Sequence, residues 1–188
     1  MKAEELAKDI IAGGQIDRER ALWLYGQPLE ELCARADQIR RHFCGDGFDL
    51  CTIVNGKSGR CSENCRFCAQ SAYHHTGAKE YPLLPMEEIL EGARRNAAQG
   101  VLRYSIVTSG RRLSDEEVDQ MCRSVRMIRD ETELSVCVSF GLLGERQYRR
   151  LKEAGVSRVH NNLETSRRYF PSICTTHTFE DKIRAIRA

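Results

Sequence analysis

Three cysteines stand within eight residues of one polar loop, Cys61, Cys65 and Cys68 in the stretch CSENCRFC. The loop is rich in glycine, serine and arginine, so it is too polar to bury the thiols as small hydrophobic side chains. Closely spaced thiolates bind metals, and two kinds of centre fit this spacing. An iron–sulfur cluster held by three thiolates would leave one of its four irons free to bind another group. A structural zinc site would need a fourth ligand, for which the candidates are Cys51, Cys44 and His74.

The composition narrows the class of protein. The chain of 188 residues is 41% hydrophobic and 30% charged, with a formal net charge of +2, which is an ordinary globular balance with no electrostatic bias toward nucleic acid. No apolar run approaches the roughly 20 residues of a membrane helix, and the first residues lack a signal-peptide core. We therefore expect a cytoplasmic protein that binds neither nucleic acid nor membrane. Nine cysteines, an odd number, favour metal ligation over disulfides.

Hydrophobic periodicity predicts the elements that must position these thiols. We expect an N-terminal helical segment over residues 1–46, and after it an alternation of strands and helices over residues 47–188. Strands are predicted at 48–55, 101–110, 134–141 and 158–164, and helices at 86–100, 114–131, 145–155 and 178–188. Ser114 and Glu117 have the spacing of a capping box at the start of one helix. Repeated βαβ units build a parallel sheet, so the fold class is α/β, either open or closed as a barrel.

The two faces of the predicted strands differ in polarity. In LSVCVSF, Val136 and Val138 point one way, while Cys137 lies on the opposite, small and polar face. The stretches around Ser105 and RVHNNLE repeat this alternation, with His160, Asn162 and Glu164 on the polar face of the last strand. An open sheet covered by helices on both faces would read as continuous apolar runs. The alternation instead favours a barrel whose polar interior holds a ligand.

A C-x3-C-x2-C loop directly after the first strand of a parallel barrel resembles the radical S-adenosylmethionine enzymes. The resemblance implies that Cys61, Cys65 and Cys68 hold a 4Fe–4S cluster, whose open iron is chelated by the amino and carboxylate groups of S-adenosylmethionine. One electron from the cluster would then break the sulfonium C–S bond and produce a 5'-deoxyadenosyl radical inside a closed, dry interior.

Two longer stretches, NGKSGRCSENCRFCAQSAYHHTG and HNNLETSRRYFPSICTTHTFEDKI, are similar to the biotin synthase family, and the resemblance runs from about Phe48 onward. It implies a TIM-type (β/α)8 barrel that inserts sulfur from an auxiliary iron–sulfur cluster into dethiobiotin to form biotin. Asn162 and Glu164 would contact the cofactor ribose or dethiobiotin. A reducing electron-transfer protein of the flavodoxin or ferredoxin type and a second copy of the chain are the expected protein partners, and no residue is assigned a catalytic role.

The auxiliary cluster is where this chain departs from the family. Ser105 stands where well-known members carry a cysteine ligand of a 2Fe–2S cluster, whereas Cys137 is kept. We expect Cys51, Cys137 and Cys44 to ligate a differently built auxiliary cluster, the alternative being that Cys44 only completes an apolar helix stripe. The other thiols suggest no chemistry: Cys33 and Cys122 are predicted core residues, and Cys174 lies in a loop with no partner nearby in sequence.

The chain length also departs from the family. A (β/α)8 barrel takes about 250 residues, and residues 47–188 supply four βα units. No helix-stop signal follows IRAIRA, so we expect the N-terminal half of a barrel, truncated at the C-terminus. Other radical enzymes, similar to lipoyl synthase or to hydrogenase maturases, are alternatives within the same superfamily. A zinc-stabilised half-barrel that only binds a partner is the alternative outside it.

Overall fold

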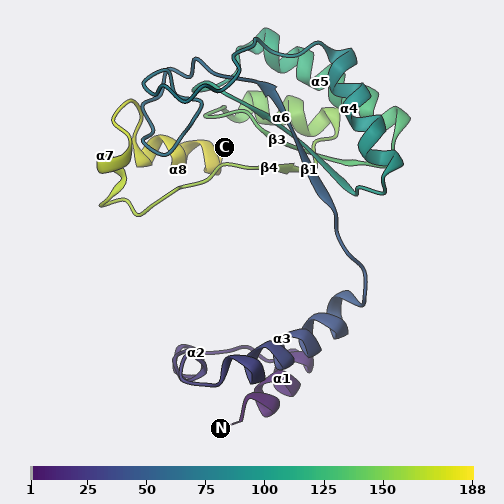
Figure 1. Cartoon of the computed structure of the whole chain (residues 1–188), viewed down its shortest axis with the longest axis vertical. Coiled ribbons are helices and arrows are strands. Elements are labelled where there is room, and N and C mark those ends of the chain that lie inside the picture. Colours follow the sequence, from purple (N-terminus) through teal and green to yellow (C-terminus); the bar gives the residue numbers. More distant parts are fainter. Residues whose placement is uncertain (1) are drawn as a thin grey trace. The chain divides into compact units, whose positions relative to one another are not determined.

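The computed structural model describes residues 2–188, which form two compact units, one ending at Phe48 and one running from Asp49 to Ala188 (Figure 1). The first unit contains α1 (Ala3–Ile11), α2 (Arg18–Leu24) and α3 (Leu29–Cys44). Helix α1 contacts α3 and buries Leu6 and Ala7. Asp17 caps α2 by accepting a hydrogen bond from the backbone N–H of Arg20 at 2.8 Å.

Helix α3 has no fully buried residue, so the prediction that Cys33 is a core residue is wrong: its side chain is exposed. The interior of this small unit is filled mainly from α1, and the predicted apolar stripe of α3 stays open, with Leu29 and Phe43 both exposed. Cys44 is also exposed, at the last residue of α3.

The second unit is built on a sheet of four parallel strands, β1 (Cys51–Lys57), β2 (Arg103–Thr108), β3 (Ser135–Ser139) and β4 (Arg158–Val159), in the order β1-β2-β3-β4. The predicted α/β fold with a parallel sheet is confirmed. The last strand is shorter than predicted. Its ladder continues only to the hydrogen bond from His160 N to Val138 O, and Glu164 adopts a left-handed conformation at φ 66°, which an extended strand cannot accommodate.

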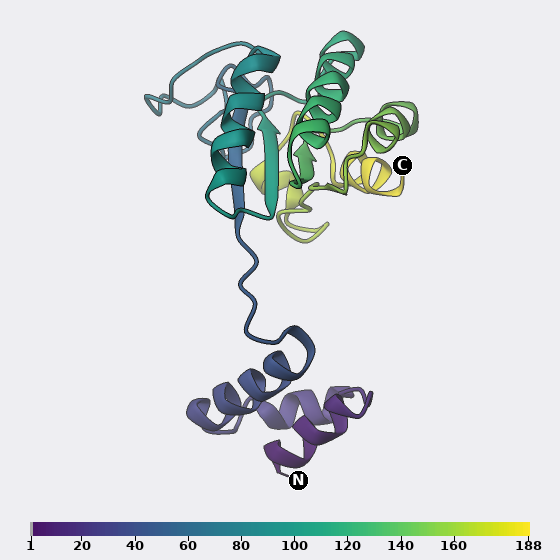
Figure 2. The ribbon, with the colours of Figure 1, turned by 90° about the vertical axis from the view of Figure 1, so that its right-hand side faces the viewer.

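Helices α4 (Met86–Ala98), α5 (Asp115–Glu131) and α6 (Glu145–Ala154) lie along one face of this sheet (Figure 2). Helix α4 approaches β2 so closely that a Cβ at Gly92 would overlap the hydroxyl of Tyr104. The predicted capping box of Ser114 and Glu117 is present at the start of α5. The core between sheet and helices is made of aliphatic, aromatic and sulfur-containing side chains, among them Ile89, Tyr104, Ile106, Met121, Ile128, Val136, Val138 and Leu151.

The opposite face of the sheet has the polar character that the alternation predicts. Ser105 is the register partner of Ile53 on one side and of Cys137 on the other. Cys137 is buried but stands outside the apolar cluster, and Ile53 is 70% exposed.

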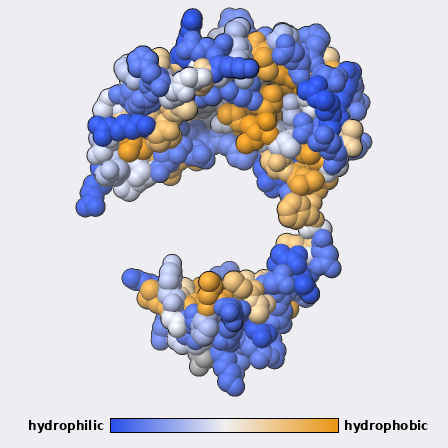
Figure 3. All heavy atoms as spheres, viewed as in Figure 1, coloured by the Kyte–Doolittle hydropathy of each residue, from blue (hydrophilic) through white to orange (hydrophobic). Residues whose placement is uncertain are grey.

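Figure 3 shows apolar residues gathered near α6 and β4, where Leu151, Val156, Val159, Ala185 and Ile186 line a surface pocket.

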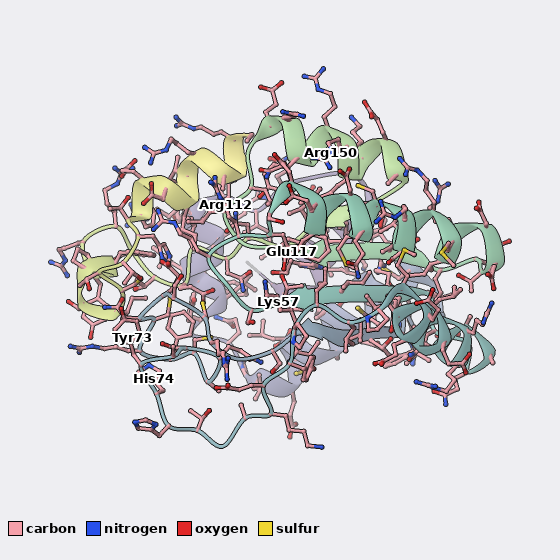
Figure 4. The ribbon with its side chains drawn as sticks, turned by 90° about the horizontal axis from the view of Figure 1, so that it is seen from above. Lys57, Tyr73, His74, Arg112, Glu117 and Arg150 are labelled. Carbon is pink, nitrogen blue, oxygen red and sulfur yellow. The ribbon has the colours of Figure 1, made fainter. Side chains whose placement is uncertain are left out.

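Two short helices complete the unit, α7 (Phe170–Ile173) and α8 (Phe179–Arg187). Seen from above, Lys57 at the end of β1 reaches Glu117 of α5, and their ion pair measures 2.6 Å (Figure 4). This contact fixes the carboxyl end of β1 against the helix layer.

In the part of the chain that the structure describes, none of the helices combines the length and the apolar character needed to cross a bilayer.

Candidate metal centre

The cysteine loop begins at the carboxyl end of β1 with a tight turn. Gly59 and Arg60 both adopt left-handed backbone conformations, at φ 74° and 50°, just before Cys61. A Cβ at Gly59 would overlap the side chain of Glu80, so this position also requires glycine for space. The side chain of Gln70 closes the turn, because its Oε1 accepts hydrogen bonds from Gly59 N at 2.5 Å and from Ser58 Oγ at 3.0 Å.

The three loop thiols face one cavity of about 220 Å³. Cys61 is buried, and Cys65 and Cys68 are partly buried. The cavity lies at the carboxyl ends of the strands, where parallel sheets bind their ligands. Its other walls come from the end of β1, the segments after β2, β3 and β4, and α8, and they include Asn55, Ser109, Gly110, Gly141, Glu164 and Lys182.

Glu164 and Lys182 bring opposite charges to this cavity. The left-handed φ of Glu164 is unusual for a residue other than glycine, and such conformations concentrate at binding sites. Lys182 of α8 donates a hydrogen bond to Asn161 Oδ1 at 3.3 Å. Asn162, the other residue predicted to contact cofactor or substrate, is exposed and does not line the cavity.

Cys65 has a second sulfur neighbour that its sequence surroundings do not indicate. Its thiol donates to Cys174 Sγ at 3.7 Å. The pKa of the Cys65 thiol is raised to about 12. Burial is the largest cause, followed by this hydrogen bond and by the charges of the neighbouring cysteines. His74 supports the same residue by donating from Nε2 to the backbone carbonyl of Cys65 at 3.1 Å. In the absence of a cation the Cys65 thiol therefore keeps its proton at neutral pH.

A buried carboxylate links the cysteine loop to the loop that carries Cys174. Glu63 Oε2 accepts hydrogen bonds from His177 Nδ1 at 2.5 Å and from Thr176 Oγ1 at 2.8 Å. Burial alone would raise the pKa of Glu63, but the hydrogen bonds from His177 and Thr176 outweigh it and hold that pKa below its usual value. Asn64 Oδ1 accepts from the backbone N–H of Thr175 at 2.9 Å, and Arg66 N donates to Ile173 O at 2.9 Å.

Sequence reasoning missed Glu63, Cys174 and His177 as members of this site. The pair Cys65 and Cys174 is separated by 109 residues, so no local pattern connects them. One signal was available: Cys174 and His177 are separated by two residues, which is a spacing typical of metal ligands.

Comparison with known proteins identifies the architecture around this site. The sequence matches the radical SAM superfamily over residues 57–188. The chain belongs to the radical SAM superfamily. Proteins of this superfamily use a 4Fe–4S cluster and S-adenosylmethionine. Three thiolates of one loop, facing a cavity at the carboxyl ends of a parallel sheet, form a donor set that fits such a cluster.

The most similar relatives include several biotin synthases. That of Akkermansia muciniphila is 57% identical over 182 residues, which cover 97% of this chain and 57% of the relative. Those of Brachyspira hyodysenteriae and Alkaliphilus metalliredigens are each 50% identical, over 98% and 100% of this chain and 56% and 59% of the relative. The resemblance to biotin synthases is thus confirmed, and the chain spans little more than half the length of these relatives.

A solved structure shows a similar fold. The crystal structure of HydG, a maturase of the FeFe-hydrogenase, superposes with a TM-score of 0.68 at 17% identity, covering 98% of this chain and 44% of that one. At this level of identity the likeness shows the fold alone.

Two of the residues predicted for an auxiliary cluster, Cys51 and Cys137, lie on the sheet and do not line the cavity of the cysteine loop. Cys51 Sγ is 3.9 Å from Ser105 Oγ, and Ser105 pairs in register with Cys137. Cys137 Sγ lies 3.9 Å from Ser157 Oγ. The structure therefore places Cys51 and Cys137 on either side of Ser105 on the polar face of the sheet. Cys44 belongs to the first compact unit.

Proposed function

We propose that the chain is the cluster-binding part of a biotin synthase, a sulfurtransferase that inserts sulfur into dethiobiotin to form biotin. The observation that carries the proposal is the convergence of Cys61, Cys65 and Cys68 on one cavity in a chain that is 57% identical to a biotin synthase over nearly its whole length. In this proposal residues 47–188 are the N-terminal half of a (β/α)8 barrel, and residues 1–46 are a separate helical segment.

The chain's own residues would hold and orient the reactants. Cys61, Cys65 and Cys68 would hold the 4Fe–4S cluster, which supplies the electron and the open iron site for cleavage of S-adenosylmethionine. The carboxylate of Glu164 lines the same cavity and can accept hydrogen bonds from ribose hydroxyls, with Asn162 beside it in the chain. Lys182 places an ammonium group there, which can bind a carboxylate.

The sulfur source in this proposal is an auxiliary iron–sulfur cluster on the polar face of the sheet. Cys51 and Cys137 would ligate it. The support is that Cys51 and Cys137 flank Ser105, the position that carries a cysteine ligand in well-known members. A hydroxyl is a weaker ligand for this type of centre than a thiolate, so the ligand set would have to be rebuilt from neighbouring thiols.

The expected partners follow from the same proposal. Dethiobiotin is the substrate, a flavodoxin-type or ferredoxin-type protein delivers the electron, and two copies of the whole protein form a homodimer in the cytoplasm. None of these partners is a nucleic acid or a membrane.

The product of the reaction tests this function. A protein that carries this chain together with the remaining length of its relatives is incubated anaerobically with S-adenosylmethionine, dethiobiotin and a reductant. We expect both 5'-deoxyadenosine and biotin. Formation of 5'-deoxyadenosine without any biotin would contradict the biotin synthase proposal, and would point to another radical SAM reaction.

A further inference from the structure

A second group of metal-ligating side chains lies directly beside the radical SAM loop. The ligand atoms of Cys65, Cys174 and His177 all lie within 4.8 Å of one another. Cys174 and His177 are buried, at 3% and 7% exposure. Only Cys65 belongs to the C-x3-C-x2-C motif, so this group is distinct from the three-thiolate set that the superfamily uses.

The distances in this group match those of a single tetrahedral ion. Two thiolates that each lie about 2.3 Å from a tetrahedral Zn²⁺ are about 3.8 Å apart, and a thiolate and an imidazole nitrogen are about 3.6 Å apart. The observed separation of Cys65 Sγ and Cys174 Sγ is 3.7 Å. His177 Nδ1 lies 3.2 Å from Cys174 Sγ and Nε2 lies 3.9 Å from it, so the ring nitrogen nearer to the sulfur is the one that Glu63 holds. A rotation of the imidazole ring that keeps its Nδ1 bond to Glu63 would turn Nε2 toward the two thiols.

The histidine has the kind of carboxylate partner that metal-ligating histidines commonly have. Its Nδ1–H donates to Glu63 Oε2 at 2.5 Å, which leaves Nε2 without a proton and free to bind. Metal-ligating histidines commonly donate their other ring N–H to a carboxylate in this way, since the carboxylate fixes the tautomer and strengthens the ligand. Glu63 is fixed in turn by Thr176 Oγ1 at 2.8 Å, and its Oε1 lies 3.8 Å from the guanidinium of Arg111.

We propose that, in the chain without its cluster, Cys65, Cys174 and His177 bind one divalent ion of the Zn²⁺ class, with water as the fourth ligand. This site goes beyond the proposed function. It shares Cys65 with the 4Fe–4S cluster, so the two centres exclude each other. An ion bound here removes one of the three thiolates that cluster assembly needs and holds it in a buried, redox-inert position.

Titration of the cluster-free chain with Co²⁺ tests the site directly, because tetrahedral Co²⁺ bound to thiolates absorbs visible light whereas Zn²⁺ does not. The wild type should bind one Co²⁺ with tetrahedral and thiolate charge-transfer bands, and Zn²⁺ should displace it. Cys174→Ser, which keeps the size of the side chain, and His177→Ala should each weaken Co²⁺ binding at least tenfold. Glu63→Gln should weaken it about tenfold, through the orientation of His177.

Cys61→Ala and Cys68→Ala are the matched controls, since they change the radical SAM loop but not this group. Both should bind Co²⁺ like the wild type. Equal binding by Cys174→Ser and the wild type would overturn the proposal. A loss in Cys68→Ala as large as that in Cys174→Ser would overturn it as well, because the ion would then sit on the three-cysteine loop.

Competition during anaerobic cluster reconstitution tests the exclusion of one centre by the other. One equivalent of Zn²⁺ added first should lower iron incorporation in the wild type and leave it unchanged in Cys174→Ser. Full iron incorporation in the Zn²⁺-loaded wild type would refute the exclusion. A chain that binds Co²⁺ as expected but takes up no iron under any condition would contradict the proposed function and leave this site standing.

Discussion

Two sets of candidate metal-binding side chains meet at Cys65, one along the chain and one across the fold. Cys61 and Cys68 approach it through the local turn geometry of a single loop, whereas Cys174 approaches it through the hydrogen bonds of Glu63 and Asn64 with a segment more than a hundred residues away. In the two proposals above the same thiol serves a cluster or a single ion, depending on which of these side chains join it.

The proposed auxiliary cluster gives a prediction at the scale of residues. In the protein with the relatives' full length, Cys51→Ala and Cys137→Ala should keep cleavage of S-adenosylmethionine and lose biotin formation, because each removes a thiolate from the sulfur-donating cluster. Ser105→Ala should change little, since a hydroxyl is a weaker ligand here than a thiolate. The measurements are 5'-deoxyadenosine, biotin and iron content. Unchanged iron and biotin in both cysteine variants would place the auxiliary cluster elsewhere.

At the scale of elements, the close packing of α4 on β2 gives a prediction about stability. Gly92→Ala puts a methyl group against the Tyr104 hydroxyl, and overpacking of this kind typically costs about 1–3 kcal/mol in the free energy of unfolding. Tyr104→Phe removes that hydroxyl, so Gly92→Ala should cost less in the Tyr104→Phe background. Urea unfolding of the four proteins measures the coupling. If Gly92→Ala lowered the free energy of unfolding equally in the wild type and in Tyr104→Phe, the Tyr104 hydroxyl would not be what limits the packing of α4 on β2.

The cap of α8 gives a prediction about pH. Asp181 accepts hydrogen bonds from the backbone N–H and the hydroxyl of Thr178 at 2.8 and 2.9 Å, and the backbone bond is the main reason that the pKa of Asp181 lies below its usual value. A depressed pKa in the folded state stabilises the protein above the unfolded pKa of about 3.9. This contribution is lost as the pH falls through the folded value.

The variant Asp181→Asn should therefore be less stable than the wild type at pH 7, and the difference should shrink as the pH is lowered below about 4. Glu180→Gln, in the same turn, is the control. Thermal unfolding followed between pH 7 and pH 3 checks this, and a difference that stays constant over that range would rule out the carboxylate as its cause.

The sequence predicts the helices and strands that depend on short-range patterns, and it does not predict the features that depend on tertiary packing. The strands up to β3, the helices around them and the Ser114 cap follow from periodicity and short-range spacing, and the structure has them close to the predicted places. Strand β4 ends at Val159 and the chain is left-handed at Glu164, and no alternation pattern reveals either feature. The contact of Cys65 with Cys174 depends on tertiary packing, which the sequence does not show. The sequence shows only the C-x2-H spacing of Cys174 and His177.

At the scale of the whole molecule, the sheet has two outer strands, β1 and β4. Ile53, on outer strand β1, is 70% exposed, and Val159 on outer strand β4 is 43% exposed. Unpaired outer strands are templates for pairing with another chain. We expect the chain of residues 1–188 to self-associate, and Ile53→Lys to weaken the association. Sedimentation velocity over a range of concentrations measures this, and a concentration-independent monomer would contradict it.

The central claim is that Cys61, Cys65 and Cys68 hold a cluster with one iron open to S-adenosylmethionine. Electron paramagnetic resonance of the anaerobically reconstituted and reduced chain, recorded with and without S-adenosylmethionine, tests it most directly. We predict a 4Fe–4S signal that changes shape when S-adenosylmethionine is added, that disappears in Cys61→Ala and Cys68→Ala, and that persists in Cys122→Ala, whose thiol is buried in the helix core. A signal whose shape does not change when S-adenosylmethionine is added, or that is unchanged in Cys68→Ala, would contradict the claim.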